Sequence, residues 1–257
     1  MLGLLLAFAA APAPSACFDF SHWTLTLPIG GEKRPDVISS ARLQGGYASA
    51  YFYAEPATQR MMFWCPIDGV TTAHTHYPRC ELREQIHGPA DDNATWRMGD
   101  FGRSELDATC VVERVGPDTG RVIVGQIHAV DFPLLKLVYA WNRRRGTGQL
   151  IAQINPDDPF HDHPADYPLA LDVPLDQPFS YSIRVVSRPG HAEVSVAIAG
   201  AVPASCRVDE SAWLAHPRKG LYFKAGDYCN DRGASATEGA LVGFSALRVV
   251  HDAGTNL

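Results

Sequence analysis

The chain has 257 residues, of which 46% are hydrophobic and 19% are charged. This composition is typical of a globular protein and excludes a disordered or fibrous one. The formal net charge is −6 at pH 7, which argues against nucleic acid as a partner. No shift in composition divides the chain, so we expect a single domain over residues 17–257.

The chain begins with an apolar run, MLGLLLAFAA, which is followed by small residues up to Ala16. A short apolar run with a small-residue tail is typical of a secretion signal. The run is too short to span a membrane, and no other segment approaches the ~20 apolar residues that a spanning helix needs. We therefore expect residues 1–16 to be a signal, the protein to be secreted or periplasmic, and the mature chain to lack a membrane span.

Short β-rich runs separated by turn residues follow along the rest of the chain. In order they are YASAYFY, MMFWCP, CELREQI, ELDATCVVERV, RVIVGQIHAV, LLKLVYAW, GQLIAQI, FSYSIRVV, HAEVSVAIAG, GLYFKAG and VGFSALRVV. Many short strands with regular turns predict an all-β sandwich, jelly roll or barrel. One short helix is expected near Glu210–Ala215, with Asp209 as its N-cap. Residues 155–178, rich in proline and aspartate, are predicted to form a long surface loop.

Six cysteines are present, at positions 17, 65, 80, 110, 206 and 229. Their even number permits disulfides in an exported protein, and six cysteines allow 15 complete pairings, among which the sequence does not choose. Their spacing does not match a zinc-finger pattern.

Three of the predicted strands carry polar side chains at alternate positions, which places those side chains on one face of each strand. They are Arg79, Glu81, Arg83 and Gln85 in the first strand, Gln126 and His128 in the second, and Tyr222, Lys224 and Tyr228 in the third. Each face taken alone is explained by an ordinary solvent-exposed side of a half-buried strand. Taken together, they predict a basic groove across a curved antiparallel sheet.

These residues also carry a family resemblance. Arg79-Cys80-Glu81-Leu82-Arg83, Gln126-Ile127-His128 and Tyr222-Phe223-Lys224-Ala225-Gly226-Asp227-Tyr228 resemble, in order and rough spacing, three motifs of the alginate lyases of polysaccharide lyase family 7. FSHWTLTLPIG resembles the opening strand of that family, and the resemblance runs from about residue 18 to about residue 250. The chain departs from the family pattern at Cys80, Cys229 and Asn230, so we expect differences in the fine shape of the groove.

The resemblance implies a β-jelly roll of two curved antiparallel sheets and an enzyme that cuts alginate by β-elimination. In this reaction a base removes the C5 proton of a uronate, the O4 glycosidic bond breaks, and a C4–C5 double bond remains. Arg79 and Gln126 are expected to neutralise the uronate carboxylate, because an arginine fork and an amide donor suit that group. His128 is the candidate base, and Tyr228 the candidate acid and second base.

Further side chains on the same faces are candidates for substrate binding. Arg83 and Lys224 are assigned as supporting charges, Tyr222 and Asn230 as groove residues, and Glu81 as a carboxylate that orients the arginines. We expect no cofactor and no metal, although His74 with His76 and His161 with His163 have the appearance of ligand pairs. The expected partner is the acidic polysaccharide alginate, and the chain is expected to act as a monomer.

Other functions remain open from the sequence. A carbohydrate-binding module on the same scaffold would use exposed aromatic residues such as Trp64 or Trp141 and would need no base. A lyase for another polyuronate, such as glucuronan, would use the same chemistry. A glycosidase would need two carboxylates flanking the bond, and on the three polar faces Glu81 stands alone. The choice between mannuronate and guluronate is also left open.

Overall fold

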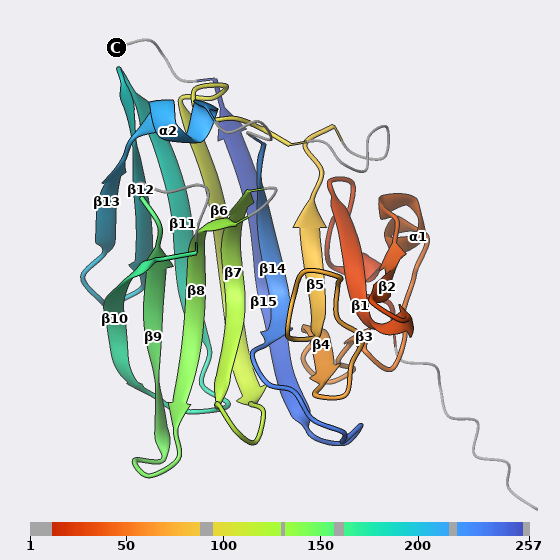
Figure 1. Cartoon of the computed structure of the whole chain (residues 1–257). Coiled ribbons are helices and arrows are strands. Elements are labelled where there is room, and N and C mark those ends of the chain that lie inside the picture. Colours follow the sequence, from red (N-terminus) through yellow and green to blue (C-terminus); the bar gives the residue numbers. More distant parts are fainter. Residues whose placement is uncertain (1–11, 88–94, 130–131, 157–161, 216–219, 254–257) are drawn as a thin grey trace, which may run out of the picture.

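The structure is a computed structural model that describes residues 12–87, 95–129, 132–156, 162–215 and 220–253. Two antiparallel sheets pack face to face (Figure 1). The expectation of a jelly roll of two curved antiparallel sheets is confirmed. The apolar run at the start of the predicted signal lies outside the described residues.

The first sheet, sheet A, has eight strands. Across the sheet they are β10 (Ala165–Val173), β9 (Thr147–Ile154), β8 (Pro133–Asn142), β7 (Arg121–Ala129), β14 (Leu221–Cys229), β5 (Arg79–Glu84), β1 (Trp23–Gly31) and β2 (Arg34–Ile38). Strands far apart in the sequence therefore become neighbours, and β14 lies between β7 and β5.

The second sheet, sheet B, has seven strands. Across the sheet they are β13 (Ala204–Val208), β12 (His191–Ile198), β11 (Phe179–Arg188), β6 (Arg103–Arg114), β15 (Gly239–Asp252), β4 (Met61–Pro66) and β3 (Phe52–Ala54). The described helices are short: η1 (Pro14–Ala16), α1 (Ser40–Gln44) and α2 (Glu210–Ala215). None of the helices in the described ranges is long and apolar enough to cross a membrane.

Alternation of side chains along the strands forms the core between the sheets. In β5 the inward residues Cys80 and Leu82 are fully buried, while Arg79, Glu81 and Arg83 take the opposite face. Aromatic rings extend this core across the opposite sheet, where Phe63 packs against Phe244 with centroids 5.5 Å apart. One face of sheet A thus packs in the core, and the other face carries polar side chains.

The structure confirms one local prediction and corrects another. Helix α2 spans Glu210–Ala215, and the Asp209 carboxylate accepts the backbone N–H of Ser211 at 2.8 Å, as expected of a capping residue. Residues 155–178 were predicted to be a loop, but they include strand β10. This strand lies at the edge of sheet A and is largely exposed, so it tolerates Pro168 and lacks the apolar alternation of a half-buried strand.

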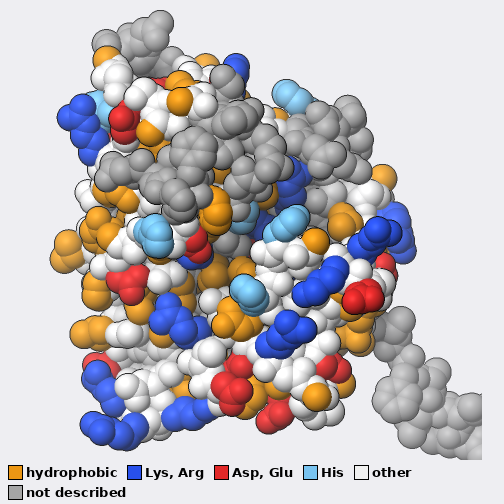
Figure 2. All heavy atoms as spheres, viewed as in Figure 1, with side chains coloured by type: hydrophobic (Ala, Val, Ile, Leu, Met, Phe, Trp, Pro, Cys, Tyr) orange, Lys and Arg blue, Asp and Glu red, His pale blue; other side chains and the backbone are white. Residues whose placement is uncertain are grey.

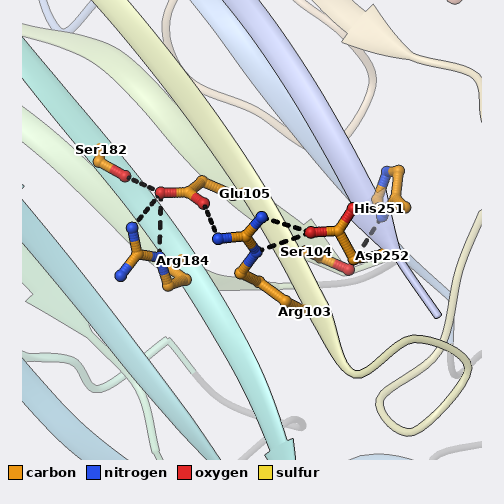
Figure 3. A network of polar contacts seen from close by, with 7 residues as sticks. All are labelled: Arg103, Ser104, Glu105, Ser182, Arg184, His251 and Asp252. Atoms are coloured by element: carbon orange, nitrogen blue, oxygen red, sulfur yellow. Dashed lines mark hydrogen bonds and ion pairs between the residues drawn. The ribbon is translucent and has the colours of Figure 1, made fainter. Parts of the chain in front are cut away.

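One end of sheet B is tied together by a polar network (Figure 3). Glu105 accepts hydrogen bonds from Arg184 and Ser182, and Arg103 bridges Glu105 and Asp252. His251 Nδ1 lies 2.9 Å from Ser104 Oγ in the same region. The network connects β6, β11 and β15, and His251 continues it toward sheet A.

Candidate active site

The three polar strand faces meet on sheet A. Strand β14 pairs with β5 so that Lys224 is opposite Arg83 and Tyr228 opposite Arg79. On its other side β14 pairs with β7, which places Tyr222 opposite His128 and Lys224 opposite Gln126. The sheet order and register therefore bring the three polar faces together on one side of sheet A.

A cavity of about 260 Å³ opens over these strands. Of the residues predicted for the site, it is lined by Arg79, Gln126, His128, Tyr228 and Asn230. Figure 2 looks onto this side of the molecule and shows histidine side chains, with Lys or Arg nearby, around a hollow over the middle strands. A larger, shallower hollow of about 660 Å³ lies on sheet B, but small and hydroxyl side chains such as Ser180, Ser182 and Ser245 dominate its lining.

Glu81 is the central polar contact beneath this cavity. It is 1% exposed, and its carboxylate accepts the Gln126 amide at 2.5 Å, the Arg79 guanidinium at 3.4 Å and the Lys224 ammonium. The carboxylate fixes the Gln126 side chain with its NH₂ group toward Glu81, and this group has a second N–H. Glu81 thus contacts Arg79, Gln126 and Lys224 together and restricts the positions of all three side chains.

Two arginines stack on the two tyrosines of β14. The Arg79 guanidinium carbon lies 3.9 Å from the centroid of the Tyr228 ring, and that of Arg83 lies 4.1 Å from the Tyr222 ring. A planar guanidinium on an aromatic face is a favourable contact that also restricts both side chains. Arg83 and Tyr222 therefore belong to the group of side chains next to the cavity, although they do not line it.

Strand β14 requires a glycine between its two tyrosines. Its pairing with β7 shifts register between Ala225 and Tyr228, which marks a β-bulge. Gly226 has φ +141°, and a Cβ there would lie 2.8 Å from the Cys80 carbonyl oxygen. Only glycine accepts both this backbone conformation and this close approach. Alternation along the strand places Tyr228 at the cavity, while Asp227, at 0% exposed, is buried on the other face.

The tautomer of His128 follows from its hydrogen bonds. Nδ1 contacts the Ala129 carbonyl oxygen, which can only accept, so Nδ1 carries the proton. The Tyr222 hydroxyl lies 3.2 Å from the same nitrogen, and the two rings stack at 5.4 Å. Nε2 of the neutral ring therefore carries the lone pair. Burial and the positive charge of Lys224 lower the pKa of His128 to about 3, so the ring stays neutral at ordinary pH.

Burial also decides the ionisation of Tyr228 and Lys224. It raises the pKa of Tyr228, and the opposing effect of Arg79 is smaller, so the hydroxyl keeps its proton. The raised pKa favours the acid role assigned to Tyr228 over its role as a second base. Burial together with the charge of Arg79 lowers the pKa of Lys224 to about 8. The cavity therefore offers one neutral acceptor, one protonated donor and several cations.

The sequence analysis missed several cavity residues. Lys136 of β8 lies opposite Gln126, lines the cavity and pairs with Asp162 at 3.0 Å. A single lysine inside the apolar run LLKLVYAW was the available signal. His74 and His76 also line the cavity. In the sequence they stand out only as a candidate pair of metal ligands.

Glu84 is a second buried carboxylate that the sequence did not single out. It points from β5 to the core side of sheet A and is 2% exposed. It accepts the Phe223 backbone N–H at 2.9 Å and the Trp96 indole N–H at 3.0 Å, and His251 Nε2 lies 2.6 Å away. Phe223 lies between Tyr222 and Lys224, so Glu84 anchors the backbone that carries both side chains.

We find no metal centre among the described residues: no group of three or more His, Cys, Asp or Glu side chains there is placed to hold an ion. His74 and His76 face the cavity instead, and His161 lies outside the described residues.

Comparison with known proteins agrees with this geometry. Residues 18–251 match a family model described as alginate lyase. The chain is 27% identical over 286 residues to an alginate lyase of Klebsiella pneumoniae, covering 95% of this chain and 93% of the relative. The crystal structure of an alginate lyase of Pseudomonas aeruginosa is 35% identical, with a TM-score of 0.79 and coverage of 91% of this chain and 100% of the other.

A third similar protein is the family 7 alginate lyase A1-II′. Its double variant, with one histidine replaced by asparagine and one tyrosine by phenylalanine, was crystallised in complex with substrate (GGMG). That structure is 30% identical to this chain, with a TM-score of 0.76 and coverage of 97% of this chain and 100% of the other.

Proposed function

Because the chain belongs to the alginate lyase family, we propose that it cleaves 1,4-linked uronate chains by β-elimination and leaves a C4–C5 unsaturated non-reducing end. The family membership makes the chain a polysaccharide lyase. The observation that carries the proposed mechanism is the presence, in one cavity, of a neutral histidine with its lone pair on Nε2 and of a tyrosine that keeps its proton.

The uronate carboxylate is the first group that the cavity must accommodate. Removing the C5 proton leaves negative charge on C5, and this charge spreads into the neighbouring carboxylate. Hydrogen-bond donors that point at the carboxylate therefore stabilise the transition state. Arg79 and the second N–H of Gln126 line the cavity, and Glu81 holds both side chains in position. Arg83 and Lys224 add positive charge beneath the same surface.

Nε2 of His128 takes the C5 proton in this proposal, and the Tyr228 hydroxyl donates a proton to the leaving O4. A pKa of about 3 makes His128 a weak base before substrate binds. An entering uronate carboxylate brings negative charge, which offsets that of Lys224 and Arg79 and favours the protonated ring. Substrate therefore raises the pKa of His128 when the base is needed. The A1-II′ variant crystallised with substrate has a histidine and a tyrosine replaced, which supports functional roles for such a pair.

The test is to incubate the protein with mannuronate-rich and guluronate-rich alginate and to follow the ultraviolet absorbance of the new double bond. Products are identified by mass, with His128→Ala as the comparison. We expect unsaturated oligouronates from the parent and a loss of ~10²-fold or more in the variant, with the larger loss on guluronate. Absence of unsaturated product from alginate, or its formation only from glucuronan, would show that the assigned reaction or substrate is wrong.

We also propose that the protein is exported and acts as a monomer. The apolar run and small-residue tail of residues 1–16 support export, and a polymer too large to enter a cell suits an exported enzyme. N-terminal sequencing of the mature protein and its mass in solution test the two proposals.

A further inference from the structure

A cluster of buried thiols lies behind the β14 end that carries Tyr228. Cys229, the residue after Tyr228, belongs to sheet A, and Cys65 of β4 belongs to sheet B. Both residues are 0% exposed. Neither takes part in the proposed reaction, and all six cysteines of the chain are free thiols in the structure.

Cys65 and Cys229 are neighbours in the interface between the sheets. Strand β4, which carries Cys65, contacts strand β14, which carries Cys229. Ala240 of β15 is the strand partner of Cys65 and also a neighbour of the Cys229 thiol. The two thiols interact with each other, and the Cys65 thiol lies 3.9 Å from the Pro66 carbonyl oxygen.

The remaining cysteines are less suited to this contact. Cys80 of β5 is also buried, but its thiol donates to the Tyr51 carbonyl oxygen at 3.2 Å. Cys110 is buried in β6, and the Cys206 thiol donates to the Arg207 carbonyl oxygen at 3.4 Å. Cys17 is exposed near the N-terminus of the described chain.

We propose that Cys65 and Cys229 form a disulfide that joins sheet A to sheet B behind Tyr228. The bond requires the two neighbouring sulfurs to approach to about 2.05 Å. It would fix the end of β14, where Tyr228 and Asn230 line the cavity, to the opposite sheet.

The chemistry is thiol–disulfide exchange with a small-molecule or protein disulfide as oxidant. The Cys229 thiolate attacks one sulfur of the oxidant, and the other sulfur leaves as a thiol. The Cys65 thiolate then attacks the mixed disulfide at Cys229 and releases the second thiol. Two protein thiols become one disulfide and the oxidant becomes two thiols, so electrons balance and two protons pass from Cys65 and Cys229 to the departing thiols.

Both sulfurs are inaccessible in the folded protein, so exchange must occur before the sheets close, while the two thiols are still solvated. Attack in the reverse order, with Cys65 first and Cys229 second, gives the same bond.

The experiment is to refold the full chain in oxidised glutathione, alkylate free thiols in denaturant, digest without reduction and identify the peptides by mass. We expect one linked peptide pair containing Cys65 and Cys229. Alkylation of both Cys65 and Cys229, or linkage of either one to Cys80, would overturn the proposal. This measurement uses the parent chain and does not depend on the folding of any variant.

Thermal unfolding supplies an independent readout with a matched control. The parent refolded with oxidised glutathione should melt roughly 5 °C or more above the parent refolded with reduced glutathione. Cys65→Ala should abolish this redox difference. Cys110→Ala also removes a buried sulfur but should keep the difference, because Cys110 lies outside the pair. Loss of the difference in both variants, or its survival in Cys65→Ala, would contradict the inter-sheet bond.

Discussion

At the residue scale, burial sets the ionisation of the side chains around the cavity, and it acts in opposite directions on acids and bases. Desolvation disfavours the charged form of any group, so it lowers the pKa of His128 and Lys224 and raises that of Tyr228. The result is a neutral acceptor and a neutral donor beside fixed guanidinium charges. This arrangement suits a reaction in which one proton is taken and another is given.

Tyr228→Phe should lower kcat by ~10²- to 10⁴-fold and change KM little, because it removes one hydroxyl that acts in the transition state. The ring and its contact with Arg79 are kept, so the melting temperature should stay near that of the parent. Tyr53→Phe, which removes a hydroxyl from β3 of the opposite sheet, is the matched control and should leave both constants unchanged. Parental turnover in Tyr228→Phe would remove this residue from the mechanism.

The pH dependence of kcat/KM should reflect the lowered pKa of His128. An unperturbed histidine becomes protonated below about pH 6.5 and would lose its basic form there. With a pKa of about 3, the neutral form persists as the pH falls, so the acid limb of kcat/KM from the free enzyme should lie below about pH 5. Measurement of kcat/KM over a series of buffers at fixed ionic strength tests this. An acid limb centred near pH 6.5 would mean that His128 is more solvated than the structure indicates.

At the element scale, the site depends on how β5, β7 and β14 are held side by side. Two carboxylates of β5 do this on opposite faces. Glu81 gathers the cationic and amide side chains beneath the cavity, while Glu84 holds the Phe223 backbone, the Trp96 indole and His251 on the core side. His251 belongs to sheet B and also contacts Ser104 beside the polar network of that sheet (Figure 3), so its contact with Glu84 links the two sheets.

Glu84→Gln should destabilise the protein by about 2–4 kcal/mol, because an amide has one acceptor oxygen and turns a donor toward groups that themselves donate. The measurement is chemical denaturation at pH 7. Glu193→Gln is the control: its carboxylate is half-exposed and lies 3.6 Å from Arg188, an arrangement worth little, so its effect should be near zero. Equal stability of Glu84→Gln and the parent would show that the three contacts are replaceable.

At the scale of the whole molecule, a chain of net charge −6 must bind a polyanion. The fold resolves this conflict by concentrating cations on one face of sheet A, where Arg79 and Lys224 contact Glu81 and Arg83 lies opposite Lys224. Local potential, rather than net charge, then governs how the substrate approaches. Lys136 extends this positive region along β8.

KM for alginate should rise with ionic strength, because salt screens attraction between the cationic face and substrate carboxylates. Arg83→Gln should raise KM at low salt and reduce this salt dependence. Arg145→Gln removes an exposed charge that pairs with Asp172 near the turn between β8 and β9. This control should leave KM at low salt and its salt dependence unchanged. A KM that is flat from low to high salt would contradict electrostatic binding of the polymer.

The sequence by itself determined the all-β class, the polar faces of three strands and the short helix capped by Asp209. These features follow from local rules: alternation along a strand, and a side chain that satisfies the first N–H groups of a helix. The three motifs also sufficed to indicate the family. Edge strand β10 was missed because an exposed strand buries too little to show a pattern.

Only the tertiary structure decided which strands are neighbours and what that does to their side chains. The insertion of β14 between β5 and β7 joins residues that are distant in the sequence, such as Tyr222 with His128 and Tyr228 with Arg79, a pairing that local periodicity does not encode. The same packing brings Lys136 to the cavity, Glu84 to Phe223 and Cys65 to Cys229. Ionisation states follow from burial, which depends on every surrounding element, so the lowered pKa of His128 and the raised pKa of Tyr228 arise only once both sheets are in place.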